Sequence, residues 1–277
     1  KRPPVEREVE DDIDYGFVGD IDSVEADILR KQLDNGLMPV VSPLSCDESG
    51  VLLTINADTV AAAIAAELDA EKLILVTGAT GGLGSAIAAN LATRGASLTL
   101  VARDSGRLAD LDLPGHKLTL DLRDPRACQA AVDAAVAHAG RLDCVVNAVG
   151  VVAFGPVADL SVDALEELFM ANTFVPVMLA KAALAVIEDD GVIVNISGVI
   201  AEQNLPGMAA YGASKAAVRA FDEALTREAR RRKVRVIDAR PPHTETGLAG
   251  RAVEGTAPRM PVGLDPVAVA ATICNAV

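Results

Sequence analysis

The sequence has 277 residues, of which 51% are hydrophobic and only 3% are aromatic, and its formal net charge is −14 at pH 7. This length suits one large α/β domain or two small ones, and the hydrophobic content is sufficient for a buried core. The excess of acidic residues argues against a nucleic-acid-binding protein with a broad basic face.

Most of the negative charge lies in the first region, residues 1–70. Residues 1–14 are charged and contain prolines, which predicts a flexible tail. Beyond the tail, the hydrophobic pattern predicts a helix at 26–33, a strand at 38–42, a strand at 51–55 and an alanine-rich helix at 59–68. We expect Asp58 to cap the second of these helices. The uneven charge indicates that this region differs in origin or role from the rest.

From residue 72 onward, short apolar strands alternate with helices, which is typical of a parallel sheet covered on both faces. The expected strands are 72–77, 97–102, 117–122, 143–147, 192–197 and 234–239. The expected helices are 83–94, 125–139, 162–187, 209–232 and one that starts near residue 266. We therefore predict an α/β fold with a doubly wound parallel sheet of the Rossmann type, preceded by an N-terminal α/β extension.

Glycines at 78, 81, 82 and 84 follow the first of these strands and open the next helix. Glycine permits a sharp turn and lets a pyrophosphate approach the free N–H groups at the start of a helix. This context of strand, glycines and helix predicts a dinucleotide-binding site. The alternative is a tight turn that binds no ligand.

The end of the second parallel strand indicates which dinucleotide binds. A cofactor with a free ribose 2′-hydroxyl usually meets an acidic residue there, whereas this sequence has Ala102 and Arg103. Because a guanidinium can pair with a 2′-phosphate, NADP(H) is favoured over NAD(H). Asp104 follows immediately and weakens this preference.

Tyr211 and Lys215 lie four residues apart in the sequence YGASK, on one face of a predicted helix. An ammonium group beside a phenol favours the phenolate and lowers the pKa of the phenol toward the range useful for acid–base work. Ser197 ends a predicted strand, where parallel sheets bind ligands, and its hydroxyl can bind a carbonyl. Alone, Tyr211 and Lys215 would be ordinary surface residues; behind the glycine loop and Ser197 they predict a catalytic site.

Together, these motifs resemble the short-chain dehydrogenase/reductase family from about residue 72 to residue 277. The matching positions are Thr77, Gly78, Gly82 and Gly84 in the glycine loop, Asp121 and Leu122 after the third strand, the segment 147–150, Asn172, Ser197, Tyr211 and Lys215. The resemblance implies an enzyme, an oxidoreductase that transfers a hydride between NADP(H) and a carbonyl or alcohol substrate.

The resemblance also implies a role for each matching residue. Tyr211 would exchange a proton with the carbonyl oxygen, and Ser197 would orient that oxygen. Lys215 would bind the nicotinamide ribose and lower the pKa of Tyr211, while Asn172 would hold a water in the proton relay. The positions expected to contact or support the cofactor are Thr77, Gly78, Gly82, Leu83, Gly84, Arg103, Asp121, Leu122, Asn147, Lys215 and Thr246. A purely structural role is the alternative for the two asparagines.

Two features depart from the family pattern. The Pro-Gly pair expected after the sixth strand is Pro241-Pro242 here, and the second proline removes an N–H and fixes φ, so we expect a loop of different shape. The sequence ends at Val277 inside a predicted helix, so we expect the domain of residues 72–277 to lack its last strand. His243 is predicted to contact substrate or solvent, with a second acid–base role as the alternative.

Residues 15–76 resemble an internal stretch of acetylglutamate kinase, in the amino-acid kinase family, and we assign 15–71 to this fragment. The matching pieces are GFVGDI, MPVVSPL and the triplet NAD before the alanine-rich helix. The resemblance implies that Asn56 contacts a substrate and that Asp58 organises phosphoryl-transfer lysines. Those lysines and the phosphate-binding loops of such kinases are missing, so we expect no kinase activity.

Cysteine use and hydropathy bear on where the protein works. The four cysteines lie far apart, without a CxxC pair or metal-ligand spacing, so we expect no metal site. We find no secretory segment at the start and no run of 18 apolar residues. We therefore expect a cytoplasmic protein that binds a small carbonyl or alcohol, binds neither membrane nor nucleic acid, and forms a homodimer or homotetramer as its relatives commonly do.

Three functions remain open at this point. The favoured one is an NADP(H)-dependent carbonyl reductase, or alcohol dehydrogenase in the reverse direction. The second, suggested by Pro242 and the missing strand, is a protein of the same fold that binds a cofactor or partner without turnover. The third is a remnant kinase module that binds an acylated amino acid through Asn56. The substrate is not assigned, although Val152, Phe154, Leu205 and Met208 in the expected pocket loops suggest an apolar body.

Overall fold

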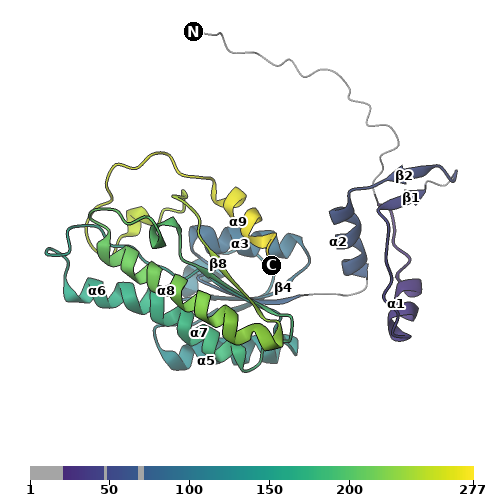
Figure 1. Ribbon diagram of the computed structural model, residues 1–277, viewed down its shortest axis with the longest axis horizontal. Coiled ribbons are helices and arrows are strands. Elements are labelled where there is room, and N and C mark those ends of the chain that lie inside the picture. The colour runs from purple at the N-terminus through teal and green to yellow at the C-terminus, as the bar shows by residue number, and fades with distance from the viewer. Residues whose placement is uncertain (1–20, 47–48, 68–71) are drawn as a thin grey trace, which may run out of the picture. The chain divides into compact units, whose positions relative to one another are not determined.

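The computed structural model describes residues 21–46, 49–67 and 72–277 of the chain (Figure 1). The chain divides into two compact units, residues 1–70 and residues 71–277, and each is described by itself. The expected flexible tail at 1–14 lies outside the described residues.

The first unit contains two helices and a two-stranded sheet. Helix α1 covers Ala26–Asp34 and helix α2 covers Ala57–Glu67. Strands β1 (Leu44–Cys46) and β2 (Leu52–Thr54) pair in antiparallel fashion. Both helices and the second strand lie where the sequence predicts them, within a few residues.

The predicted strand at 38–42 is wrong. These residues have no partner strand among the described residues, and the strand that does form begins at Leu44. Met38 and Val40 are 90% and 94% exposed, so the apolar side chains that suggested a strand pack against little. Pro39 and Pro43 lack the N–H groups that a central strand needs to donate, which explains why hydrophobicity alone misled the prediction.

Helix α2 begins at Ala57, two residues before its predicted start. The side-chain oxygen of Asn56 accepts a hydrogen bond from the backbone N–H of Thr59, at 3.2 Å. This is the geometry of an N-cap, in which the residue before the helix reaches the third N–H group within it. The cap is therefore Asn56, and Asp58, which we expected to serve as the cap, lies in the first turn.

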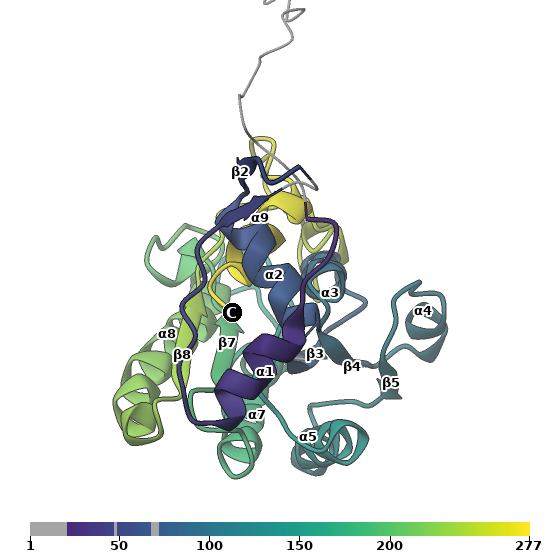
Figure 2. The same cartoon turned by 90° about the vertical axis from the view of Figure 1, so that its right-hand side faces the viewer.

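The second unit is built on a six-stranded parallel sheet with the order β5-β4-β3-β6-β7-β8 (Figure 2). In chain order its strands are β3 (Leu73–Thr77), β4 (Ser97–Ala102), β5 (His116–Thr119), β6 (Cys144–Asn147), β7 (Val192–Ile196) and β8 (Arg235–Ala239). The chain runs outward from β3 to β5 and then returns to the other side of β3. Between β3 and β6 lies the switch point at which open α/β sheets bind ligands.

Helices cover both faces of this sheet (Figure 1). Successive residues of a strand face opposite ways, so Leu75 packs on one side while Ile74 and Val76 pack on the other. The helices on the Leu75 side include α5 (Pro125–Ala139), α7 (Val175–Leu184) and α8 (Ala209–Glu228), and those on the opposite side include α3 (Gly82–Thr93) and α9 (Pro266–Cys274). The doubly wound α/β fold is confirmed.

The predicted helix at 162–187 is interrupted by a π-helical turn. Helix α6 (Val162–Phe169) leads into this turn, Met170–Phe174, and α7 follows it. Pro176 has no N–H and cannot close the α-helical hydrogen bond to the carbonyl of Asn172, which accounts for a wider turn at this place. The interruption therefore coincides with a predicted site residue.

By length and composition alone, the stretch Val162–Leu184 would be apolar enough to cross a membrane. Half of it is buried inside the second unit, where α7 contributes to the core beside the sheet. Because the core helix of a soluble protein passes the same test, this stretch is weak evidence for a membrane span.

Two local features differ from the sequence prediction. Strand β5 ends at Thr119, short of the predicted 122. A five-residue helix that we did not predict, α4 (Ser105–Ala109), follows β4. Within residues 72–277, β8 lies at one edge of the sheet and no strand follows α9.

Candidate active site

The glycine loop lies between β3 and α3, beside the switch point of the sheet. Gly78 has a φ of +68°, and a Cβ there would lie 2.6 Å from the carbonyl oxygen of Ala148, in the loop after β6. A Cβ at Gly82 would lie 2.5 Å from the carbonyl oxygen of Thr246, and one at Gly84 would collide with the Gly78 carbonyl. Only glycine fits these three positions, which pack three loops together at the start of a helix.

A cavity of about 290 Å³ lies between this loop and the ends of β4 and β5. Gly78 and Leu122 form part of its wall, and Leu122 is buried. Four arginines also line it: Arg103, Arg107, Arg123 and Arg251. The cavity therefore joins a glycine-rich backbone surface to a group of guanidinium side chains, a combination suited to a phosphate-bearing ligand.

Asp121, which we expected to contact or support the cofactor, is paired with Arg123. The Nη2 of Arg123 lies 2.5 Å from Oδ2 of Asp121, and this hydrogen bonding holds the pKa of the Asp121 carboxyl below its usual value. The same guanidinium reaches Glu167 of α6, with Nη1 and Oε2 2.8 Å apart. These ion pairs connect the segment after β5 to helix α6 beside the cavity.

Arg103 is exposed at the end of β4 and lies 3.6 Å (Nη1 to Oε1) from Glu167. Asp104, the residue that weakened the cofactor prediction, accepts a hydrogen bond from the backbone N–H of Arg107 at 3.0 Å. Its carboxylate thus caps α4. The Arg107 guanidinium donates to the carbonyl oxygen of Thr80 in the glycine loop.

A buried row of polar side chains crosses the sheet below this cavity. The Thr77 hydroxyl donates to the side-chain oxygen of Asn147 at 3.0 Å, and the Asn147 amide donates to Asn195 at 3.3 Å. The Asn195 amide donates in turn to Asp222 of α8 at 2.7 Å, and burial raises the pKa of Asp222 to about 7. Thr77 and Asn147 therefore tie β3, β6 and β7 together where the site begins.

Asn172, in the π-helical turn, is fully buried and holds the loop after β6. Its side-chain oxygen accepts from the backbone N–H of Val151, and its amide donates to the carbonyl oxygen of Val151, both at 2.9 Å. The same amide also donates to the Ser214 hydroxyl at 3.0 Å. In this structure the Asn172 side chain holds the backbone of Val151. This contact agrees with a structural role for Asn172, the alternative left open by the sequence.

Tyr211 and Lys215 lie one turn apart on α8, and both line a second cavity of about 430 Å³. The Lys215 amino group donates to the carbonyl oxygen of Ile196 at 2.7 Å, and burial lowers its pKa to about 8. A Cβ at Gly150 would lie 3.4 Å from this amino group and 3.3 Å from the Asn172 side-chain oxygen. Tyr211 and Lys215 thus border the cavity, while Asn172 is buried beside Gly150, near the amino group of Lys215.

The tyrosine does not have the lowered pKa that we expected from its lysine neighbour. Burial raises the pKa of Tyr211 to about 12. Removing a phenol from water penalises its anion, and this burial is the cause of the rise. The phenol of Tyr211 is therefore protonated at neutral pH.

Ser197 follows β7 and borders the same cavity, but its hydroxyl is engaged elsewhere. The side chain is buried, at 1% exposure, and donates its proton to the carboxylate of Asp238 on the adjacent strand β8. A hydroxyl has a single proton to donate. In this structure the Ser197 hydroxyl is thus paired with Asp238, and its role at a substrate carbonyl stays a prediction.

The second cavity also contains the glycine loop, and its outer part is mainly apolar. Leu83 and Thr246 lie on the wall that is shared with the glycines. The apolar side chains beyond Tyr211 include Val152, Phe154, Ile200, Leu205, Met208 and Met260. Four of these are the residues from which the sequence suggested an apolar substrate body.

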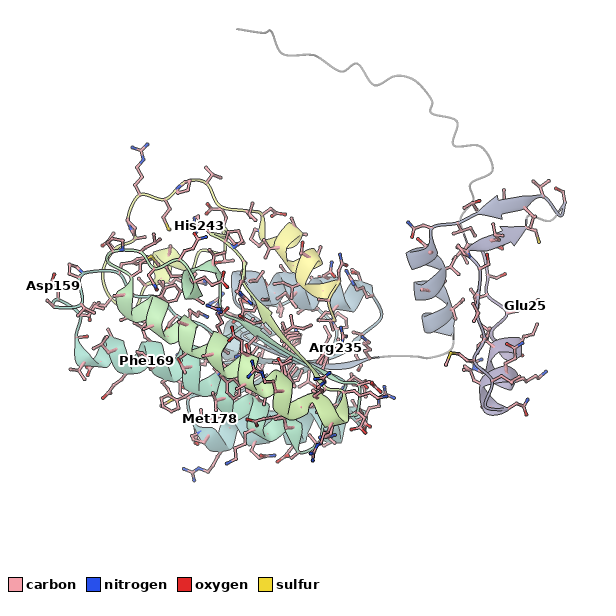
Figure 3. All side chains as sticks on the ribbon, in the orientation of Figure 1. Glu25, Asp159, Phe169, Met178, Arg235 and His243 are labelled. Carbon is pink, nitrogen blue, oxygen red and sulfur yellow. The ribbon has the colours of Figure 1, made fainter. Side chains whose placement is uncertain are left out.

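The loop after β8 carries Pro242 and His243, and it is held by hydrogen bonds to a later segment (Figure 3). The carbonyl oxygen of His243 accepts from the N–H of Leu264 at 2.8 Å. The Nε2 of the His243 ring lies 3.4 Å from Oε1 of Glu245, and the ring borders the second cavity. This places His243 at the mouth of the site, beside the apolar wall.

Five charged residues of the site were not predicted from the sequence: Arg107, Arg123, Glu167, Asp238 and Arg251. Asp238 did carry a signal, because an acidic residue inside the mainly apolar strand 234–239 needs a favourable partner. The others lie on helix or loop positions that are exposed or partly exposed, where a charged residue is ordinary. Their role in the cavity depends on contacts between segments far apart in the chain.

Two family profiles match this chain. The profile described as short chain dehydrogenase matches residues 72–257, and the profile of the amino acid kinase family matches residues 5–81. The second match agrees with a curated relative: an acetylglutamate kinase from Trichodesmium erythraeum is 53% identical over 66 residues, 24% of this chain and 23% of the kinase. The front resemblance is confirmed, and it covers about a quarter of that enzyme.

The second unit has relatives along most of its length. Dehydrogenase/reductase SDR family member 7B from Bos taurus is 32% identical over 226 residues, which cover 74% of this chain and 70% of that protein. A short chain dehydrogenase from Burkholderia cenocepacia in complex with NADP has a TM-score of 0.65 at 27% identity and covers 73% of this chain and 88% of its own. An alcohol dehydrogenase from Thermococcus sibiricus, complexed with 5-hydroxy-NADP, has a TM-score of 0.67 at 25% identity and covers 74% and 90%.

Proposed function

The chain belongs to the short chain dehydrogenase family of oxidoreductases, and from this premise we propose that it transfers a hydride between NADP(H) and a carbonyl or alcohol substrate. The observation that carries the proposal is that Tyr211 and Lys215 border the same cavity as the glycine loop. The apolar side chains beyond Tyr211 favour a substrate with an apolar body.

The residues present fit a nicotinamide dinucleotide. The close approach of backbone at Gly78, Gly82 and Gly84 leaves a cradle that any Cβ would fill, at the start of helix α3. When bound there, NADP(H) supplies or accepts the hydride. Thr77 and Asn147 support the cradle through their buried hydrogen bond.

Tyr211 would serve as the acid–base group. Its phenol is protonated at neutral pH, which is the form that can give a proton to the oxygen of a carbonyl substrate. Lys215, one turn further along α8 and held by the Ile196 carbonyl, would be the cation that stabilises the phenolate that remains. Asn172 fixes the loop after β6 at Val151, a residue that borders the first cavity.

Preference for NADP(H) over NAD(H) is supported by charge. Arg103 lies at the end of β4, and Arg107 and Arg123 line the same cavity. The nearby carboxylates of Asp104 and Asp121 are engaged by the start of α4 and by Arg123, so neither is placed to accept a free ribose hydroxyl. Two structural relatives were determined with NADP or a derivative of it.

The proposal is tested by Tyr211→Phe. The change removes one hydroxyl and leaves the ring, so we expect NADPH oxidation with the best of a panel of ketones and aldehydes to fall about 1000-fold or more. Cofactor binding, measured by fluorescence titration, should stay within about twofold because the phenol lies beyond the glycine cradle. Retained turnover would refute the role assigned to Tyr211.

A second candidate function has a specific observation in its favour. Because the Ser197 hydroxyl donates to Asp238, the predicted carbonyl donor is already paired in this structure, as would fit a protein that binds the cofactor without turnover. This alternative predicts that NADPH binds but that no carbonyl in a broad panel accelerates its oxidation. Robust oxidation of NADPH by a single carbonyl compound would eliminate it.

A further inference from the structure

The ends of β7 and β8 carry a buried acidic residue that the proposed reaction does not use. Asp238 has a side chain that is 9% exposed, and one of its oxygens accepts the proton of Ser197. Its other oxygen, Oδ2, lies 2.8 Å from Nε of Arg240. A carboxylate in such a position is costly unless it interacts favourably with charges near it, so its surroundings bear on its role.

This carboxylate lies directly behind the anchor of the site lysine. Lys215 donates to the carbonyl oxygen of Ile196, and the next residue is Ser197, whose hydroxyl is bound to Asp238. One short stretch of β7 backbone therefore carries both contacts. The negative charge of Asp238 acts on Lys215 by favouring its ammonium form, against the burial that disfavours it.

Other charged groups around the pair are few. Arg240 faces Asp238 from the end of β8 and also binds Glu202. Asp222 faces Asp238 from α8, where its carboxyl accepts from Asn195. Tyr211, His243 and Arg251 line the cavity that contains the amino group of Lys215. Among these groups, Asp238 is the acid whose charge acts on the lysine.

We propose that Asp238 is a positioning residue, which fixes the end of β7 through Ser197 and so sets the place and the electrostatic surroundings of the Lys215 amino group that this strand end binds. The inference rests on the proposed function, because it is in that reaction that a charged Lys215 matters. It also gives Ser197 a purpose that agrees with its observed contact: the hydroxyl connects the acid to the strand that holds the lysine.

The test uses the whole chain, labelled with ¹³C at the lysine ε carbon and titrated by NMR from pH 6 to pH 11. The signal of Lys215 is identified by its loss in Lys215→Arg. In Asp238→Asn the side chain keeps its size and an oxygen that accepts from Ser197, but it loses its charge. Because the ammonium is then less favoured, we expect the titration midpoint of Lys215 to fall by about 0.5 to 1 pH unit.

Two further variants give the measurement its controls. Asp159→Asn removes an exposed acid from a loop and should leave the Lys215 midpoint unchanged. Arg240→Gln removes the cation that offsets Asp238, so it should raise the midpoint, and it keeps the proposal testable if Asp238→Asn fails to fold. An unchanged midpoint in Asp238→Asn, or a fall in Arg240→Gln, would overturn the proposal.

The NMR experiment does not depend on turnover, so the two proposals can fail separately. If wild-type protein oxidises NADPH with no carbonyl compound while the midpoint moves as expected, the proposed function fails and the placement of Asp238 stands. If turnover is observed, the alkaline limb of the pH profile should move to lower pH in Asp238→Asn. A uniform loss of activity at every pH, with an unmoved limb, would mean that Asp238 is merely structural.

Discussion

The first unit of this chain has the higher sequence identity to a known protein, but the second unit has the larger hydrophobic core. The first unit is 53% identical to a kinase over 66 residues, yet Ala26 and Ile55 are the only buried hydrophobic residues among those described in it. The second unit resembles its relatives at about 30% identity, and hydrophobic cores form on both faces of its sheet. Identity reports common descent, whereas a stable core requires that the packing partners of each element be present.

The same contrast holds for chemistry. The second unit contains a full set of complementary parts: a glycine cradle, arginines around a cavity, and a tyrosine with a lysine on one helix face. The first unit keeps Asn56, but that side chain caps α2, and the unit's described basic residues are Arg30 and Lys31 on α1. Phosphoryl transfer needs positive charge arranged around the phosphates, which two neighbouring residues of one helix do not supply.

The largest expected effect is on stability, and it compares one leucine from each unit. Leu75 is fully buried at the centre of the second unit, whereas Leu52 of β2 is 66% exposed. We expect Leu75→Ala to lower the free energy of unfolding of the second unit by about 3 kcal/mol, through lost burial and the cavity left behind. Leu52→Ala should change the same free energy of unfolding by less than about 0.5 kcal/mol.

Urea denaturation followed by circular dichroism measures both variants against the wild-type chain. Equal losses from the two substitutions would break the comparison, because they would show that Leu52 is buried against something the second unit depends on. A small loss from Leu75→Ala would contradict the assignment of that residue to the main core.

We expect the first unit not to bind acetylglutamate, the substrate for which the kinase it resembles is named. Calorimetry with acetylglutamate at millimolar concentration should give no heat beyond dilution, because Asn56 is engaged at a helix start and the match covers only 23% of the kinase. Heat that disappears in Asn56→Ala would show that the first unit retains a binding site, and would restore the remnant-module hypothesis.

Most of the fold of the second unit could be predicted from the sequence, for a physical reason. Strands such as Ser97–Ala102 are continuous apolar runs, and the helix Pro125–Ala139 is bounded by a proline at its start and a glycine at its end. The π-helical turn at Met170–Phe174 could not be predicted from apolar periodicity, which is nearly the same on both sides of it. In the first unit, residues 38–42 resembled a strand because hydrophobicity says nothing about whether a partner strand exists.

The candidate site divides along a similar line. The glycine loop and the pair of Tyr211 and Lys215 are local patterns, so the sequence indicated them. The hydroxyl contact of Ser197 depends on its neighbour across the sheet: β7 and β8 pair with Asn195 opposite Asp238, which sets the carboxylate beside the end of β7. The spacing of residues in the sequence does not predict contacts between distant segments. The ion pairs of Glu167 with Arg103 and Arg123 are further contacts of this kind.

The central claim is that the second unit, within the whole chain, forms a working NADP(H) site. Gly84→Ala should abolish binding because its Cβ would collide with the Gly78 carbonyl, whereas Gly250→Ala, with nothing within 4 Å of the added atom, should bind as the wild type does. Both variants are titrated with each nucleotide, with Gly84→Ala as the test and Gly250→Ala as its matched control.

The most direct measurement is the fluorescence titration of the purified chain with NADPH and, separately, with NADH. We predict micromolar binding of NADPH and binding of NADH that is at least about tenfold weaker, a difference of about 1.4 kcal/mol, because Arg103 and its neighbours have no 2′-phosphate to pair with in NADH. Equal affinities would contradict the charge argument at Arg103. Binding of neither nucleotide would contradict the claim that the second unit carries a functional dinucleotide site.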